Sequence, residues 1–290
     1  MSTKHRPRRS MLYMPGSNAR ALEKGRGLDA DALILDLEDA VAPDAKQIAR
    51  EQVVAAVKEG GYGHREILVR ANGLNTPWGY DDLVAAAQSG ADAVLLPKVD
   101  SADMVRQAEA VIDAAGAPEG MTIWCMMETP RGMLRAEEIA DATPRLGGFV
   151  MGTSDLAKDL HARHTAMRLP MITSLGICLL AARAAGIAIL DGVYLDLSDD
   201  AGCVESCVQG AELGFDGKTL IHPKQLAPAN EAFAPSAAEV DFSRRIIEAH
   251  AAAEAEGKGV LVVDGKLIEN LHVENAKRLV ALAEAIANRL

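Results

Sequence analysis

The chain has 290 residues, a formal net charge of -11 and a hydrophobic fraction of 49%, but an aromatic fraction of only 3%. The negative charge argues against a nucleic-acid-binding protein, because phosphate contacts at physiological salt need clustered Lys and Arg. The one basic cluster, KHRPRR at residues 4–9, is interpreted as a solvated N-terminus. No apolar run approaches the ~18 residues of a membrane span, and no signal-peptide core follows the basic start. We therefore expect a cytoplasmic protein.

Short aliphatic runs predict eight β-strands, at residues 10–14, 32–36, 66–70, 93–97, 122–128, 147–152, 188–196 and, more weakly, 215–222. The segments between them have the apolar spacing of helices, and several end in Gly. Strands that alternate with helices pair in parallel through right-handed crossovers. The pattern predicts an α/β fold, a closed (β/α)8 TIM barrel. A doubly wound open sheet is the alternative, but no glycine-rich dinucleotide motif follows the first strand.

The last part of the chain breaks this alternation. Residues 237–259 read as a long helix, residues 260–266 as a short strand and turn, and residues 273–290 as an amphipathic helix. We predict two parts, a catalytic barrel over residues 1–235 and a C-terminal helical extension over residues 236–290.

Polar residues follow the predicted strands at the end where a (β/α)8 enzyme builds its active site. They are Asp36, Glu38, Asp39, Arg70, Asn72, Lys98, Glu128, Asp155, Asp196 and His222. Acidic residues at such positions also serve as N-caps of the next helix, which is the alternative for each of them.

Glu128 is the clearest candidate for a functional carboxylate. The sequence Thr129-Pro130 supplies the cap and first position of the next helix, which leaves Glu128 without a local partner. A buried carboxylate is costly unless it is paired or bound to a metal. Asp155 is placed similarly one strand further along the chain. Two carboxylates with room for water and substrate oxygens suit Mg²⁺, so we predict a divalent metal at Glu128 and Asp155.

Two further sets of charges are candidates for binding. Arg70 ends the third predicted strand, where its planar fork suits a carboxylate or a developing oxyanion, and a salt bridge to Glu38 or Asp39 is the alternative. Arg20 and Lys24 lie four residues apart on a helix after the first strand and suit phosphate groups. A solvated helix face is the alternative for that pair.

The cysteines and histidines point to packing and not to a metal. Cys125 and Cys178 fall in apolar segments, and Cys203 and Cys207 lie one helical turn apart without a second ligand pair. The His161 and His164 pair lies in a polar segment and is interpreted as surface-exposed.

With these residues in place, the sequence resembles the citrate lyase β-subunit-like family, within the HpcH/HpaI group of metal-dependent aldolases that act on 2-oxo acids and coenzyme A thioesters. The resemblance covers the whole chain. It rests on RSMLYMPGSN at the first strand, DLEDAV at 36–41, VRANGLNTPWGYDDL at 69–83, LLPKV at 95–99, METPRG at 127–132, GTSDL at 152–156, GFDGKTLIHPKQ at 214–225 and DGKLIEN at 264–270.

The resemblance implies roles for these residues. It implies that Glu128 and Asp155 bind Mg²⁺, that Arg70 contacts substrate and oxyanion, and that Arg20 and Lys24 contact coenzyme A. It also implies a homo-oligomer, a trimer or hexamer, in which the C-terminal extension reaches a neighbouring subunit. There many members of the family have an aspartate that serves the neighbour's active site, whereas this chain has Glu269, one methylene longer.

The implied activity is a Mg²⁺-dependent carbon–carbon lyase that cleaves a carboxylated 3-hydroxyacyl-CoA, such as malyl-CoA or citramalyl-CoA, into acetyl-CoA and a 2-oxo acid. Arg70 would stabilise the enolate oxygen and Glu269 would exchange the proton at the acetyl carbon. Hydrolysis of the malyl-CoA thioester is one alternative. Another is a citrate lyase β subunit acting on an acyl carrier protein thioester, although the long C-terminal extension favours a stand-alone enzyme.

Overall fold

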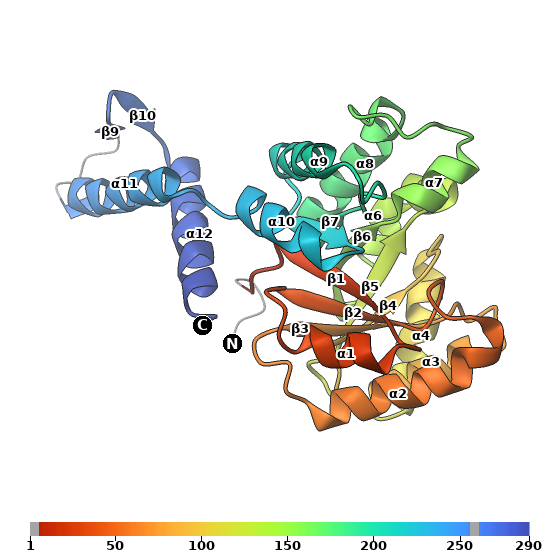
Figure 1. The fold of residues 1–290 in the computed structure, drawn as a ribbon. Helices are drawn as coiled ribbons and strands as arrows, with labels where there is room; N and C mark the ends of the chain where they lie inside the picture. The colour runs from red at the N-terminus through yellow and green to blue at the C-terminus, as the bar shows by residue number, and fades with distance from the viewer. Residues whose placement is uncertain (1–5, 256–260, 290) are drawn as a thin grey trace. The chain divides into compact units, whose positions relative to one another are not determined.

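Residues 8–233 form one unit of the chain, and a closed barrel of eight parallel strands lies at its centre (Figure 1). The computed structural model describes residues 6–255 and 261–289. The strands are β1 Ser10–Pro15, β2 Ala32–Asp36, β3 Glu66–Arg70, β4 Ala93–Leu96, β5 Thr122–Met127, β6 Leu146–Met151, β7 Ala188–Asp191 and β8 Gly217–Leu220. Each strand pairs with the next one in sequence, and β8 pairs with β1 to close the barrel. The predicted (β/α)8 fold is therefore confirmed.

At least one helix follows each strand of the barrel. They are α1 Ala19–Gly25, α2 Lys46–Glu59, α3 Gly79–Ala87, α4 Ala102–Ala114, α5 Pro130–Leu134, α6 Ala136–Ala140, α7 Thr153–Asp159, α8 Leu169–Ala185, α9 Asp200–Leu213 and α10 Leu226–Ala232, with 3₁₀ turns η2 Pro43–Ala45 and η3 Pro223–Gln225. The seventh strand was predicted to run to residue 196, which is wrong. It ends at Asp191, and a Cβ on the following Gly192 would lie 2.6 Å from Thr153 Oγ1, so the chain leaves the sheet in a crowded position.

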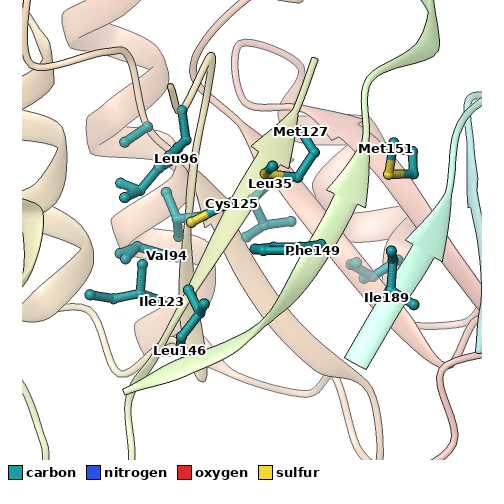
Figure 2. Close-up of a cluster of buried hydrophobic side chains, with 14 of the residues drawn as sticks. Leu35, Val94, Leu96, Ile123, Cys125, Met127, Leu146, Phe149, Met151 and Ile189 are labelled. Carbon is teal, nitrogen blue, oxygen red and sulfur yellow. The ribbon is translucent and has the colours of Figure 1, made fainter. Parts of the chain in front are cut away.

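Alternating side chains of the strands form two buried layers, as the pleat of a strand requires. One layer fills the barrel and includes Ile34, Leu95 and Trp124. The other lies between the strands and the helices, where Figure 2 shows Leu35, Val94, Cys125 and Phe149 among its members. Full burial of an aliphatic or aromatic side chain of this size contributes roughly 1.5–3 kcal/mol. Both layers hold the strand ends, and the residues that follow them, on a rigid scaffold.

The second part of the chain comprises residues 234–255 and 261–289, together with Arg6 and Pro7. It contains α11 Ala237–Ala255, an antiparallel hairpin of β9 Leu261–Val263 and β10 Lys266–Ile268, and α12 Asn270–Ala287. The second strand of the hairpin was not predicted, and α12 begins three residues earlier than expected. Residues 256–260 of the predicted helix and strand lie outside the described residues.

A small apolar core holds this second part together, formed by Ile246 of α11, Val263 and Ile268 of the hairpin, and Val273 of α12. The hairpin turns at Asp264 and Gly265, whose φ angles are 50° and 75°. Positive φ at both positions is what a two-residue type I′ hairpin turn needs, and Asp-Gly is a favoured pair for it. None of the helices within residues 6–255 and 261–289 is both long and apolar enough to cross a membrane.

Candidate active site

Glu128 lies directly after β5 and is 3% exposed. The cap of the following helix is Thr129, whose hydroxyl accepts a hydrogen bond from the N–H of Gly132 at 3.0 Å, and Pro130 is the first residue of α5. This local prediction is confirmed. The Glu128 carboxylate is therefore not used as a cap, and its Oε1 accepts a hydrogen bond from the backbone N–H of Lys98 at 2.7 Å.

Burial raises the pKa of Glu128 to about 7, and the N–H and charge of Lys98 oppose this only in part. Asp191 is a useful contrast, because it is equally buried but contacts Lys218 Nζ at 2.8 Å and Arg168 Nη1 at 2.6 Å. Burial alone would raise the pKa of Asp191, yet these two cations hold it below its ordinary value. Asp191 is thus a neutralised structural charge, whereas Glu128 is a buried carboxylate to which a cation would bind favourably.

Gly152 forms one wall of the Glu128 site. It directly follows β6 and is the N-cap residue of α7, and a Cβ at this position would lie 2.3 Å from Oε2 of Glu128 and 2.4 Å from its Cβ. Contacts this short do not occur between real atoms, so any larger residue would displace the Glu128 side chain. The Gly-Thr-Ser-Asp sequence therefore does two things, since Gly152 makes room for Glu128 and the next turn carries Asp155.

Asp155 lies in the first turn of α7, and its side chain is 27% exposed. Its Oδ2 is 3.6 Å from Lys98 Nζ, and its Oδ1 is 3.4 Å from Nζ of the exposed Lys158. Lys98 thus contacts both predicted metal ligands, Glu128 through its backbone and Asp155 through its side chain. The structure places the two carboxylates around one residue at the end of β4.

Arg70 is the last residue of β3 and is 7% exposed. Its Nε and Nη2 donate hydrogen bonds to Asp36 at 2.7 and 2.6 Å, and its Nη1 is 2.9 Å from Glu38. Asp39 is further away, at 3.7 Å. The salt bridge to Glu38 is present, but sequence reasoning missed Asp36 as the main partner. The signal was available, since Asp36 and Arg70 end adjacent strands and are opposite each other in register.

A ring of aromatic and charged groups completes this region. The Tyr13 ring centroid lies 4.9 Å from the Arg70 guanidinium carbon, a cation–π contact. Glu38 bridges the two cations, because its Oε1 is 2.7 Å from Lys98 Nζ. Lys98 has a φ of 50°, in the left-handed region that residues other than glycine rarely adopt. Tyr13 and Lys98 had no predicted role.

Arg70 and Lys98 contact five carboxylates between them, so acidic groups outnumber basic ones in this cluster. The carboxylates are those of Asp36, Glu38, Asp39, Glu128 and Asp155. No group of three or more His, Cys, Asp or Glu side chains that could hold a metal occurs within residues 6–255 and 261–289. Mg²⁺ is commonly bound by one or two carboxylates, with waters and substrate as its other ligands. The residues present therefore fit Mg²⁺ better than a metal that needs a closed protein cage.

The predicted coenzyme A contacts, Arg20 and Lys24, lie on α1, the helix that follows β1. Both side chains are exposed, and neither forms an ion pair with another described residue. Asn18 caps this helix by accepting a hydrogen bond from the N–H of Ala21. Because α1 follows the C-terminal end of β1, the two cations belong to the same end of the barrel as Arg70.

Glu269 lies in the second part of the chain, at the N-cap position of α12. It is exposed, and its backbone N–H donates to Nδ1 of His272 at 3.0 Å. Within residues 234–255 and 261–289, no cation forms an ion pair with its carboxylate.

The other predicted candidates lie elsewhere. Asp196 accepts hydrogen bonds from Ser198, and His222 accepts one from the backbone of Lys224, so both serve local turns. His161 and His164 are exposed, as expected. The four cysteines, Cys125, Cys178, Cys203 and Cys207, are buried and form no disulfide.

Comparison with known proteins gives the same family in sequence and in structure. The profile of the HpcH/HpaI aldolase/citrate lyase family matches residues 9–223. A (3S)-malyl-CoA thioesterase of Cereibacter sphaeroides strain KD131 is 54% identical over 287 residues, which are 99% of this chain and 98% of the relative. The citrate lyase subunit beta of Escherichia coli K12 is 39% identical over 286 residues, 97% of this chain and 95% of the relative.

Among solved structures, the protein CitE of Mycobacterium tuberculosis in complex with magnesium, acetoacetate and coenzyme A is similar over 97% of this chain and 99% of its own. The TM-score is 0.75 and the sequence identity is 28%. RipC of Yersinia pestis has a TM-score of 0.69 and 29% identity over 82% of this chain and 99% of its own.

Proposed function

This chain belongs to the HpcH/HpaI aldolase/citrate lyase family, and from that premise we propose that it is an enzyme acting on the coenzyme A thioester of a small hydroxy dicarboxylic acid, of the malyl-CoA type. The observation that carries the proposal is the cluster at the end of the barrel. There the buried carboxylate of Glu128 accepts a hydrogen bond from a backbone N–H, and the charge of Arg70, a guanidinium fixed by Asp36, acts on it.

We propose that Glu128 and Asp155 hold Mg²⁺. A bound Mg²⁺ would supply a Lewis acid for the oxygens of a carboxylated substrate. Support comes from the raised pKa of Glu128, from the excess of carboxylates, and from the magnesium in the complex of the Mycobacterium tuberculosis protein CitE. A glutamate with a pKa near 7 would be partly protonated at neutral pH when no cation is bound. Replacing its proton by a metal ion at that pH therefore needs little free energy.

Arg70 would stabilise negative charge on the thioester oxygen. Asp36 accepts two of the five N–H donors of the guanidinium and Nη1 lies 2.9 Å from Glu38, which leaves at least two N–H donors for a substrate oxygen. Both reactions considered for this family place charge on that oxygen, as a tetrahedral adduct in hydrolysis or as an enolate in carbon–carbon cleavage. One arginine therefore serves either outcome, and the site alone does not distinguish them.

For the outcome we propose hydrolysis. Water adds to the thioester carbon, the carbon–sulfur bond breaks with its electron pair going to sulfur, and the products are malate and free coenzyme A. This is supported by the 54% identity to a (3S)-malyl-CoA thioesterase over almost the whole chain.

Carbon–carbon cleavage is the second candidate, and the 39% identity to a citrate lyase subunit beta favours it. In that reaction the substrate hydroxyl loses its proton, the bond to the hydroxyl-bearing carbon breaks, and its electron pair stays with the acetyl group. The products are glyoxylate and acetyl-CoA. Glu269 would then donate a proton to the acetyl carbon, which balances the proton lost by the hydroxyl.

The remaining assignments concern binding and assembly. We propose that Arg20 and Lys24 contact the phosphates of coenzyme A, because they are exposed cations free of ion pairs with the other described residues. We also propose that the C-terminal extension packs on a neighbouring subunit of a homo-oligomer, a trimer or hexamer, and supplies Glu269 to that subunit. Its exposed carboxylate and exposed Val262, Leu267 and Leu271 support an interaction there.

The test is a product analysis with purified protein, (3S)-malyl-CoA and either Mg²⁺ or a chelator. Hydrolysis gives malate and free coenzyme A, and cleavage gives acetyl-CoA and glyoxylate. Acyl-CoA substrates without the second carboxylate should be inert under both proposals. Full activity in chelator, or activity only on an acyl carrier protein thioester, would contradict the proposed function.

A further inference from the structure

Lys98 makes three contacts with acidic groups at the end of the barrel. Its backbone N–H donates to Glu128 Oε1 at 2.7 Å, its Nζ lies 2.7 Å from Glu38 Oε1, and the same Nζ lies 3.6 Å from Asp155 Oδ2. It does so with a φ of 50°, a left-handed conformation that is unfavourable for a lysine. Such backbone strain persists only where the surrounding structure enforces it, and it clusters at functional sites.

In this conformation Lys98 contacts both Glu128 and Asp155, the two carboxylates that we propose as metal ligands. The N–H fixes one oxygen of Glu128, while the side chain brings a positive charge to Asp155. Glu38 holds that charge in place, because its other oxygen is 2.9 Å from Arg70 Nη1 and Glu38 is itself largely buried. The Lys98 ammonium is therefore held close to the place where a divalent cation would contact Asp155.

We propose that Lys98 is a positioning residue that sets the affinity of the site for a divalent cation, because its ammonium group competes with that cation for Asp155. The inference rests on the proposed function, in that it takes Glu128 and Asp155 as the metal ligands. Lys98 offsets the repulsion among the carboxylates before the cation binds. It then opposes binding by charge repulsion and by holding Asp155.

Lys158 provides a matched control for this proposal. Its Nζ also contacts Asp155, at 3.4 Å, but the side chain is 71% exposed and contacts neither Glu38 nor Glu128. Water and salt screen exposed charges, so Lys158 should matter little for binding. The two lysines thus share one partner and differ in burial and in their other contacts.

The experiment measures the binding of Mn²⁺ to the full chain by electron paramagnetic resonance, and of Mg²⁺ by calorimetry, without substrate. Repulsion between a monovalent and a divalent charge a few ångströms apart changes a binding constant by about tenfold even at the dielectric constant of water. Lys98→Met should therefore bind Mn²⁺ about tenfold more tightly than the parent. Lys98→Arg keeps the charge and should remain within about threefold, and Lys158→Met within about twofold.

A second readout separates competition from simple structural support. Without the cation, Lys98→Met should lower the melting temperature, because the carboxylates then repel one another. The increase in melting temperature on adding saturating Mg²⁺ should be larger in Lys98→Met than in the parent, since a tighter ligand stabilises the folded state more. If Lys98→Met does not fold, Lys98→Gly removes the same charge and relieves the positive φ.

The outcomes distinguish this inference from the proposed function. Unchanged or weaker Mn²⁺ binding in the folded Lys98→Met or Lys98→Gly protein would overturn the role of Lys98, provided that Glu128→Gln still weakens binding. Parental binding in Glu128→Gln would instead show that the metal site is misassigned, and both proposals would fail together. Tighter binding by Lys98→Arg to the same extent as by Lys98→Met would also overturn the competition, because charge would not be its cause.

Discussion

The carboxylate of Asp36 accepts two hydrogen bonds from the guanidinium of Arg70, at 2.7 Å from Nε and 2.6 Å from Nη2. The two residues end neighbouring strands and are paired in register, so the barrel itself sets their relative position. The Tyr13 ring packs on the guanidinium. This arrangement fixes both the plane and the direction of Arg70 before any substrate arrives, which is what stabilisation of a developing charge requires.

The first prediction is that Asp36→Asn lowers turnover by roughly 10²-fold, because a guanidinium misplaced by about 1 Å loses its alignment with the reacting oxygen. The effect should appear mainly in kcat if Arg70 acts in the transition state. Asp39→Asn is the control, since Asp39 is 63% exposed and 3.7 Å from Arg70, and it should change turnover by less than about twofold. Parental turnover in Asp36→Asn would show that the pair is only structural.

Arg70→Lys should also lose most turnover, by about 10²-fold or more, although the positive charge is retained. Lysine cannot reproduce the two parallel hydrogen bonds to Asp36, and it has no planar fork for an oxyanion. Arg50→Lys is a matched change at another ion pair, with Asp82 at 2.7 Å, between α2 and α3. That variant should keep its turnover. If Arg70→Lys had the same turnover as the parent in a steady-state assay, the salt bridges of Arg70 would have only a structural role.

Glu128 predicts a pH dependence of stability in the metal-free protein. Its pKa in the folded chain is about 7, above the ordinary value near 4.5. A raised pKa means that the folded state holds the proton more tightly, so this contribution to stability is present below the ordinary pKa and is lost as the pH rises through 7. Glu128→Gln cannot ionise and avoids that loss. With a chelator present, we compare the free energy of unfolding of Glu128→Gln with that of the parent. This difference should change by ~2–3 kcal/mol in favour of the variant between about pH 5 and about pH 8.

Urea unfolding at the two pH values measures this difference. The exposed Glu119→Gln is the control and should show no comparable trend. A Glu128→Gln protein whose advantage over the parent stays constant with pH would mean that Glu128 is ionised in the metal-free fold. Saturating Mg²⁺ should reduce the advantage of the variant at high pH by about 1.4 kcal/mol or more, because the parent is expected to bind the cation at least tenfold more tightly than the variant.

The fourth prediction concerns the C-terminal extension. If Glu269 serves a neighbouring subunit, co-expression of Arg70→Ala with Glu269→Ala should restore activity, since some sites in mixed oligomers hold both intact residues. Arg70→Ala with Glu128→Ala is the control. Both of those residues belong to residues 8–233, so no mixed oligomer regains a complete site. Mass analysis should confirm mixing, and an inactive Arg70→Ala and Glu269→Ala mixture would mean that Glu269 serves its own chain or none.

Glu269→Asp tests the departure from the family's aspartate. A carboxylate moved by about 1 Å changes rates by on the order of 10²-fold, so this variant should alter turnover while leaving metal binding unchanged. An increase would mean that the longer side chain is a compromise, and a decrease that the pocket is adapted to it. Turnover identical to the parent would argue against a catalytic role.

The amino-acid sequence by itself determined the features that depend on neighbouring residues. Short aliphatic runs predicted the eight strands, because strands of a parallel barrel are buried on both faces. Helical spacing predicted the helices between them, because each helix buries one face. The Thr129-Pro130 start of α5 also followed from sequence, since a cap hydrogen bond joins groups three residues apart. That local fact freed Glu128 for another role.

Only the tertiary structure decided which charges meet. Asp36, Glu38 and Asp39 lie within four residues of one another, and the choice of Asp36 as partner of Arg70 came from the register of β2 against β3. Lys98 was a strand-end residue of no stated role until its positive φ and its contacts with Glu128 and Asp155 were known. Spacing along a chain does not encode such contacts, because they depend on the closure of the barrel and on residues that lie tens of positions apart.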